Sequence, residues 1–153
     1  MEIERKFLVE YDARPKDIIT GRHIRQGYVT SEGAFSLRVR LSKFENGDET
    51  AELTLKKTHS ARSRYEYNFL MDLSKAQELY DLCVSKLEKV RYEIPVGNHT
   101  WEVDEFRGSN FGLVLAEIEL KSEDETFVKP DWVGVEVTGW PQYLNQNLAK
   151  EWR

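Results

Sequence analysis

The chain has 153 residues, of which 40% are hydrophobic and 32% charged, a size and composition that favour one folded domain with a single core. The formal net charge of −5, from 22 basic and 27 acidic residues, argues against non-specific binding to nucleic acid. The single cysteine, Cys83, excludes an internal disulfide, and no apolar run approaches the length that crosses a membrane. No signal peptide opens the sequence, so we expect a soluble cytoplasmic protein.

The first predicted strand, residues 1–9, carries charge on one face. Glu2, Glu4 and Lys6 occupy every second position, and successive side chains of a strand point to opposite faces. Two carboxylates at this spacing can chelate a hard cation, and the lysine can bind an anion that accompanies the cation. The alternative is a solvent-exposed strand face whose charges have no function.

Four more strands are predicted in the first half of the chain, each with one apolar and one polar face. After a polar loop with room for one short helix at 10–21, they cover residues 23–30, 34–42, 49–57 and 64–70. Their polar faces carry Tyr28, Arg38, Arg40, Glu52, Lys56, Arg64 and Glu66. The Asn46-Gly47 dipeptide predicts a hairpin turn between the third and fourth strands of the chain.

One amphipathic helix is predicted next, with Ser74 and Gln77 as a capping box and an apolar stripe that reaches Leu87. Cys83 lies on this stripe and is predicted to be a small buried core residue. Further strands are predicted at 88–94, 100–106, 114–121 and 134–138, and a short acidic helix at 122–128. A terminal helix is predicted to open at Pro141, with Leu144, Leu148 and Trp152 repeating every four residues.

The later strands also collect charge on one face: Lys89 with Arg91, Glu102 with Asp104, Glu117 with Glu119, and Glu136. An open sheet with a water-exposed outer face would explain such a pattern in an arbitrary protein. The repeated like-charged pairs favour a mainly β (α+β) fold, an antiparallel barrel whose charged faces line a tunnel and whose apolar faces point outward to a few covering helices. Oxygen ligands for a hard cation and cationic groups for phosphate oxygens suit a metal-bound polyphosphate.

The order of these motifs resembles the CYTH superfamily, the triphosphate tunnel metalloenzymes. Glu2-x-Glu4-x-Lys6 is similar to the family's opening signature. Seven later elements resemble family motifs in the same order: Gln26-Gly27-Tyr28, Leu37-Arg38-Val39-Arg40, Leu53-Thr54-Leu55-Lys56, Arg64-Tyr65-Glu66, Lys89-x-Arg91, Glu102-x-Asp104 and Glu117-x-Glu119. The resemblance covers almost the whole chain, so residues 1–153 are predicted to form a single domain. Asn68 departs from the pattern, because small bacterial members often have a second glutamate at that place.

The resemblance implies an eight-stranded antiparallel barrel that binds a triphosphate compound with Mg²⁺ or Mn²⁺. It implies the metal ligands Glu2, Glu4, Glu117 and Glu119, with Glu66 and Asp104 close by. It implies that the phosphate groups are bound by Lys6, Arg38, Arg40, Lys56, Arg64, Lys89 and Arg91. Tyr28 and Lys56 match positions that family hydrolases use, and we predict that this dyad orients or deprotonates the attacking water. The predicted partner is a small-molecule triphosphate, without nucleic acid or membrane, and a homodimer is left open.

In small bacterial members the usual activity is hydrolysis of inorganic tripolyphosphate, which is the function predicted here. The alternatives are a class IV adenylate cyclase, a thiamine triphosphatase, and a polyphosphate- or nucleotide-binding module without turnover. The short loops leave little sequence for a purine pocket, although Tyr28, Phe35 and Phe106 are available for stacking. The four glutamates implied as metal ligands favour an enzyme over a binding module. The histidines are scattered and are predicted to be surface or turn residues: His23, His59 and His99.

Overall fold

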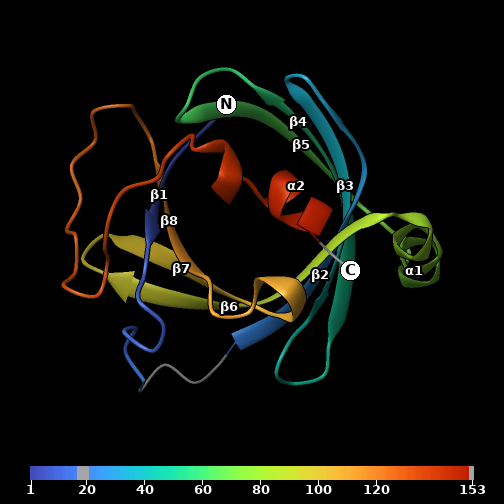
Figure 1. Ribbon diagram of the computed structural model, residues 1–153, viewed down its shortest axis with the longest axis horizontal. Coiled ribbons are helices and arrows are strands. Elements are labelled where there is room, and N and C mark those ends of the chain that lie inside the picture. Colours follow the sequence, from blue (N-terminus) through green and yellow to red (C-terminus); the bar gives the residue numbers. More distant parts are fainter. Residues whose placement is uncertain (17–20, 152–153) are drawn as a thin grey trace.

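Eight antiparallel strands close into a barrel in the computed structural model, which describes residues 1–16 and 21–151 (Figure 1). The strands are β1 (Glu2–Leu8), β2 (Gly21–Glu32), β3 (Phe35–Lys43), β4 (Glu49–Thr58), β5 (Ser63–Leu70), β6 (Ser85–Val96), β7 (His99–Phe106) and β8 (Val114–Leu120). Around the barrel they follow the order β1-β5-β4-β3-β2-β6-β7-β8. The predicted eight-stranded barrel is therefore confirmed.

The N-terminal strand β1 closes the barrel between β5 and β8. Its pairing with β8 runs from Ile3↔Leu120 to Leu8↔Leu115. Its pairing with β5 is short, because only Glu2↔Arg64 and Ile3↔Ser63 are in register. The hairpin between β6 and β7 turns at Gly97, which has a φ of 61°. Residues with a Cβ atom disfavour this conformation, so glycine suits the turn.

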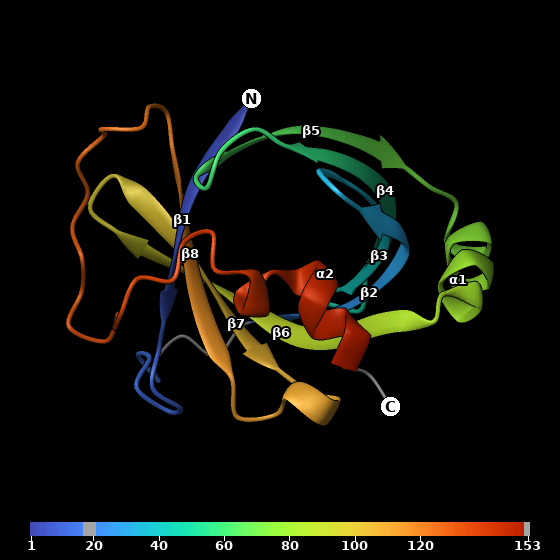
Figure 2. The same cartoon turned by 45° about the horizontal axis from the view of Figure 1, so that its top comes forward.

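Helix α1 (Leu73–Leu82) lies outside the barrel and packs on β2, β3 and β4 (Figures 1 and 2). It buries Ala76 and Tyr80 against residues of β3 and β4. The predicted capping box is wrong: the N-cap is Asp72, whose Oδ2 accepts a hydrogen bond of 3.1 Å from the Lys75 N–H. The predicted apolar stripe extended beyond the end of the helix, because Leu87 lies in β6. Cys83 is buried, as predicted.

The segment between β8 and the C-terminal helices runs along the outside of the barrel and contradicts two predictions. Residues 122–128 form no helix, because Glu125 accepts a hydrogen bond from the Lys121 N–H and Ser122 donates one to Asp124, contacts that favour a turn. Residues 134–138 make only an isolated bridge, Phe7↔Glu136, instead of a strand. They occupy the edge of β1 just beyond the residues that pair with β5.

The C-terminal segment occupies one end of the barrel, within the ring of strands (Figures 1 and 2). Its predicted single helix is three short pieces: the 3-10 helix Pro141–Tyr143, α2 (Asn145–Leu148) and the 3-10 helix Ala149–Glu151. Leu148 and Ala149 are buried against Tyr28, Leu87 and Phe106. This end of the lumen is therefore filled by an apolar core. The C-terminal segment closes the barrel here instead of covering its outside. Trp152 lies outside the described residues.

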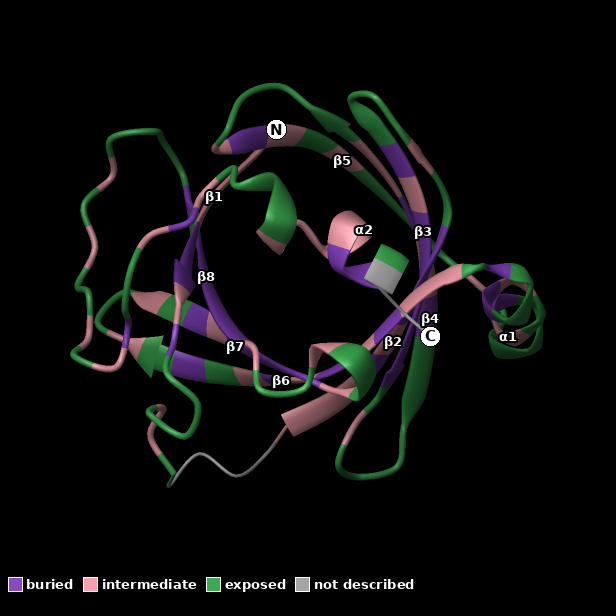
Figure 3. Cartoon of the chain, in the orientation of Figure 1, coloured by how far each residue is buried: buried purple, intermediate pink, exposed green. Residues whose placement is uncertain are grey.

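Burial follows this arrangement, with buried residues in the strands and exposed residues in the hairpins and loops (Figure 3). A second apolar cluster lies outside β1, β7 and β8, where Trp101 packs edge-on against Phe7, Phe127 and Trp132. Another short 3-10 helix, Gly108–Asn110, links β7 to β8. No helix in the described part of the chain is long and apolar enough to span a bilayer.

Candidate active site

The barrel encloses a cavity of about 210 Å³ that is lined almost entirely by charged and polar side chains. Every predicted site residue lines this cavity except Asp104. Six further described residues line the cavity but were not predicted as site residues: Arg22, Ser36, Glu102, Leu144, Asn145 and Gln146. Glu102 was predicted to face the tunnel but was given no role. Glu136, predicted on the same charged face, lies elsewhere, because it pairs with Arg5 outside the barrel.

The acidic side of the cavity is formed by β1, β5 and β8, whose carboxyl groups meet in two pairs. Burial raises the pKa of Glu2 to about 9, and a hydrogen bond to Glu66 adds to this rise. Burial also raises the pKa of Glu4 to about 7, together with the neighbouring Glu117. In each pair, burial and the neighbouring carboxyl group favour the protonated form of one member, and a cation bound between the two would take the place of that proton. The partner of Glu66 is Glu2, so the asparagine at position 68 does not deprive Glu66 of an acidic neighbour.

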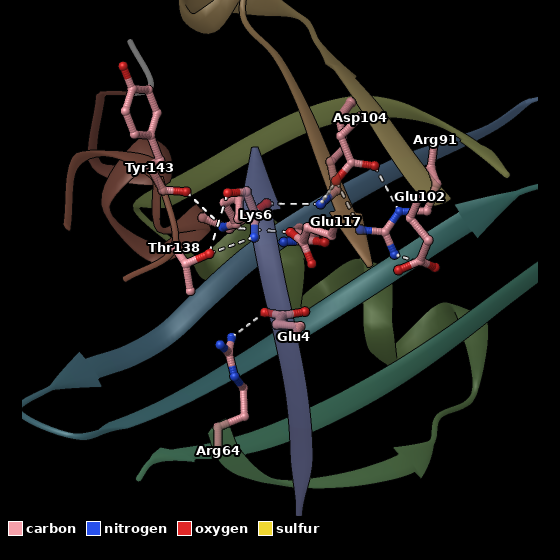
Figure 4. Close-up of polar contacts among 12 residues, drawn as sticks. Glu4, Lys6, Arg64, Arg91, Glu102, Asp104, Glu117, Thr138 and Tyr143 are labelled. Atoms are coloured by element: carbon pink, nitrogen blue, oxygen red, sulfur yellow. Dashed lines mark hydrogen bonds and ion pairs between the residues drawn. The ribbon is translucent and has the colours of Figure 1, made fainter. Parts of the chain in front are cut away.

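The remaining acidic groups complete this side without forming a compact cluster. Arg64 Nη1 lies 2.5 Å from Glu4 Oε1 (Figure 4). Glu119 lines the cavity from β8, and burial together with the nearby Glu102 raises its pKa. Within residues 1–16 and 21–151, no three His, Cys, Asp or Glu side chains are already arranged to hold a metal ion. The convergence of four glutamates on one cation therefore stays a prediction.

The ion pairs of the basic wall on β3 and β4 are long, although Arg40 Nε also donates a hydrogen bond of 2.8 Å to Gln26 Oε1. Arg38 lies 3.9 Å from Glu66, Arg40 lies 3.8 Å from Glu52, and Lys56 lies 4.0 Å from Glu66. The Nε atoms of Arg38 and Arg64 are buried without a hydrogen-bond partner. Burial, and then the charge of Arg38, lowers the pKa of Lys56 to about 8. Because buried donors are normally satisfied, this wall is suited to bind the oxygens of an anion.

Asp104 does not line the cavity but binds two cationic side chains of β6 that do, Lys89 and Arg91 (Figure 4). Its Oδ2 accepts a hydrogen bond of 2.8 Å from Lys89 Nζ, and Arg91 donates to both Asp104 oxygens at 2.8 and 2.9 Å. Arg91 Nη1 also donates to Glu102 at 3.2 Å. Burial lowers the pKa of Lys89 to about 7 despite this carboxylate. In this arrangement Asp104 positions Lys89 and Arg91, and its predicted role as a metal ligand stays untested.

The C-terminal segment contacts two lysines of the site, which the sequence did not indicate. Lys6 Nζ donates to the Tyr143 carbonyl at 2.9 Å (Figure 4), and Lys89 Nζ donates to Asn145 Oδ1 at 2.9 Å. Lys6 also lies 3.6 Å from Glu117. The closed end of the cavity is therefore polar on its inner surface although its core is apolar.

The proposed dyad of Tyr28 and Lys56 faces the same cavity from strands that flank β3. The Tyr28 hydroxyl accepts a hydrogen bond of 3.3 Å from Gln26, and Lys56 forms its ion pair with Glu66. The two side chains are not hydrogen-bonded to each other, so their joint action stays a prediction. The three histidines do not line the cavity; they contact Glu88, Ser63 and Glu125.

A closed antiparallel barrel with a charged interior, opened by Glu2-x-Glu4-x-Lys6, defines a class of protein, and the chain belongs to it: the CYTH domain family, whose model matches residues 1–147. The chain is 45% identical to an inorganic triphosphatase of Acetivibrio thermocellus, with 97% of this chain and 93% of the relative covered. It is 36% identical to an inorganic triphosphatase of Nitrosomonas europaea, with 97% and 96% covered. A crystal structure of an inorganic triphosphatase matches with a TM-score of 0.68 and 33% identity, covering 98% of this chain and 95% of the other.

Proposed function

We propose that this chain is a divalent-metal-dependent inorganic triphosphatase that hydrolyses tripolyphosphate. The observation that carries the proposal is the enclosed cavity, in which eight lysine and arginine side chains face six glutamates. Such a cavity neutralises a small, highly charged anion on all sides and excludes most of the surrounding water. The two relatives named inorganic triphosphatases support the same function, because they match this chain over nearly its whole length.

The donor set fits a hard divalent cation, Mg²⁺ or Mn²⁺. Paired carboxyl groups at Glu2 and Glu66 and at Glu4 and Glu117 supply oxygen ligands that must otherwise share a proton. We propose that Glu2, Glu4, Glu117 and Glu119 hold the metal and that Glu66 supports them. When bound, the metal would neutralise phosphate oxygens and lower the pKa of a coordinated water.

The other side chains bind and orient the substrate in this proposal. Arginine offers a planar fork to phosphate oxygens, which suits Arg38 and Arg40, whereas the lysines act as point charges. Lys56, with its pKa lowered to about 8, is partly neutral at mildly alkaline pH. It can then take a proton from the attacking water, with the Tyr28 hydroxyl orienting that water from the neighbouring side.

The cavity favours an inorganic substrate over a nucleotide or thiamine derivative. Tyr28 is the one aromatic side chain among the described residues that line it, which leaves little surface for stacking a base or a heterocycle. Phe106, considered for stacking, is buried in the apolar closed end, and Phe35 lies on the exposed tip of β3. A cyclase would need an adenine pocket that this lining does not supply.

The function is tested by measuring phosphate release from tripolyphosphate, ATP, thiamine triphosphate and pyrophosphate, with Mg²⁺ or Mn²⁺ and with excess chelator. We expect tripolyphosphate to be the preferred substrate and the chelator to abolish turnover. Glu4→Gln should also abolish turnover while leaving the circular dichroism spectrum unchanged, and Tyr28→Phe should lower kcat more than it raises KM. Full turnover in chelator, or faster formation of cyclic AMP from ATP, would refute the proposal.

A further inference from the structure

Arg22, at the start of β2, differs from the other arginines that line the cavity. Each of the others has a carboxylate within ion-pair distance: Arg38, Arg40, Arg64 and Arg91. In the described part of the chain Arg22 has no such partner. Its guanidinium carbon lies 5.6 Å from the centre of the Phe44 ring, and its buried Nε has no hydrogen-bond partner. An unsatisfied donor on a permanent charge requires an explanation, and an anionic ligand provides one.

Arg22 extends the arginine wall of the cavity. Arg38 and Arg40 share the inner face of β3, and the charges of Arg38 and Arg91 both act on Arg40. Arg91 on β6 is directly opposite Arg22 on β2 in the sheet register. Like charges at opposed positions repel, but Arg91 is already neutralised by Asp104 and Glu102. Among the arginines that line the cavity, Arg22 is therefore the one without a neutralising carboxylate in residues 1–16 and 21–151.

A second cavity adjoins the first, and Arg22 and Arg91 line both. Its other lining residues include Phe44, Glu45 and Glu93, and neither glutamate forms an ion pair with Arg22. The two cavities therefore meet at these two arginines. The guanidinium of Arg22 stands at the junction.

The C-terminal segment limits the extension of a bound anion, because it closes one end of the barrel. Tyr28 packs with Leu148 at the closed end, and Arg22 lies six residues earlier on the same strand, about 20 Å away at the rise of an extended chain. A phosphate chain held by Arg38, Arg40 and Arg91 cannot lengthen toward Leu148. Another cavity adjoins the first through Ser36, Lys56 and Arg64, but these two cations already face Glu66 and Glu4. Past Arg91 the chain meets Arg22, which has no carboxylate partner in the described residues, so this direction is favoured.

We propose that Arg22 forms a further phosphate-binding position, which takes the fourth phosphate group of a linear inorganic polyphosphate longer than tripolyphosphate. This inference rests on the proposed function and adds to it a residue that sets chain-length preference. Tripolyphosphate would occupy the inner arginines without reaching Arg22. Tetrapolyphosphate would gain a charge-assisted hydrogen bond there, a contact that is worth about tenfold in affinity.

The experiment compares tetrapolyphosphate with tripolyphosphate in the wild-type protein, Arg22→Gln and Arg22→Lys. We expect Arg22→Gln to lower kcat/KM for tetrapolyphosphate, relative to that for tripolyphosphate, by about tenfold, and Arg22→Lys to retain part of the preference. Calorimetric titration of both anions into the metal-free protein supplies a readout that does not depend on turnover. There the ratio of the two dissociation constants should fall by about the same factor in Arg22→Gln.

The matched control is Arg25→Gln, which removes the same charge from the outer face of the same strand, where Arg25 binds Gln77. It should leave both ratios unchanged. Equal losses with the two anions in Arg22→Gln, or no loss with either, would overturn the inference. If the wild-type protein releases no phosphate from tripolyphosphate, the proposed function fails, and the calorimetric ratio still decides the role of Arg22.

Discussion

The charged residues of the cavity fall into two groups that differ in how tightly they are held. Asp104, Lys89 and Arg91 are nearly completely buried and joined by hydrogen bonds of 2.8–2.9 Å. Arg38 and Arg40 have their carboxylates at 3.8–3.9 Å instead. The first group is a fixed part of the wall, because none of its charges can be left unpaired without a large penalty. Arg38, whose Nε has no hydrogen-bond partner, can turn toward a ligand, whereas Arg40 is also held by a hydrogen bond of 2.8 Å from its Nε to Gln26 Oε1.

Removal of the Asp104 charge should therefore destabilise the whole protein. In Asp104→Asn the buried Arg91 loses its main counter-charge, and we expect the free energy of unfolding in urea to fall by about 3–5 kcal/mol. The control is Asp12→Asn, since the exposed Asp12–Lys16 pair should contribute less than about 1 kcal/mol. A loss in Asp104→Asn as small as that of the control would show that Asp104 is not the residue that holds this wall together.

At the scale of secondary structure, the sequence pattern located the elements but misplaced several ends. The α1 stripe continued to Leu87 because an inward apolar residue of β6 falls by chance at a helical spacing. Arg22 was missed because β2 was begun at His23, although Arg22 shares the phase of Ile24 and Gln26. The C-terminal segment was predicted as one helix but forms three short helical pieces, because the chain is extended at Leu144. Amphipathicity alone also does not tell whether such a segment covers a barrel or enters it.

The corrected start of α1 yields a direct test. Asp72→Ala removes the side chain that caps the helix, and we expect it to lower the free energy of unfolding by about 0.5–2 kcal/mol. Ser74→Ala, at the position favoured by the sequence pattern, lies inside the first turn and should change stability by less than about 0.5 kcal/mol. Equal effects of the two substitutions in a urea titration would contradict the cap seen at Asp72.

For the molecule as a whole, alternation of charge along the strands predicted which side chains share a face. The repeated like-charged pairs favoured a barrel over an open sheet, and the resemblance to the CYTH superfamily implied its closure with eight strands. Register could not be derived in this way, so neither the Asp104 network nor the Glu2–Glu66 pair was predicted. Both depend on which residues of different strands stand opposite each other.

An ion pair outside the barrel, Arg5 with Glu136, joins the first strand to the segment that follows the last strand. Arg5 donates to both oxygens of Glu136 at 2.8 and 2.6 Å, and Thr138 donates to one of them at 2.6 Å. These contacts, chiefly the hydrogen bonds from Arg5, lower the pKa of Glu136 to about 2 from 4.5. The pair fixes the segment after β8 against β1, where the strand is not covered by β5.

This pKa gives the pair a defined pH dependence. A carboxylate whose pKa is lowered on folding stabilises the protein above pH 4.5, and the contribution is lost as the pH falls toward 2. The wild-type protein should exceed Glu136→Gln in unfolding free energy at pH 6–7 by about 1 kcal/mol or less, because the carboxylate side chain is 29% exposed. The difference should shrink through the acid range. A difference that stays constant from pH 7 to pH 2 would rule out this linkage.

The strand order has a consequence for biosynthesis. β1 leaves the ribosome first, yet its long partner is β8, which ends at Leu120, so the first strand made waits for the last. At about 5–20 residues per second this interval is roughly 6–20 s, during which β1 has an unpaired backbone. Exposed strand edges invite aggregation, and charged side chains are one natural protection against it. Glu2, Glu4 and Lys6 would thus protect the nascent chain from aggregation before they line the cavity of the folded protein.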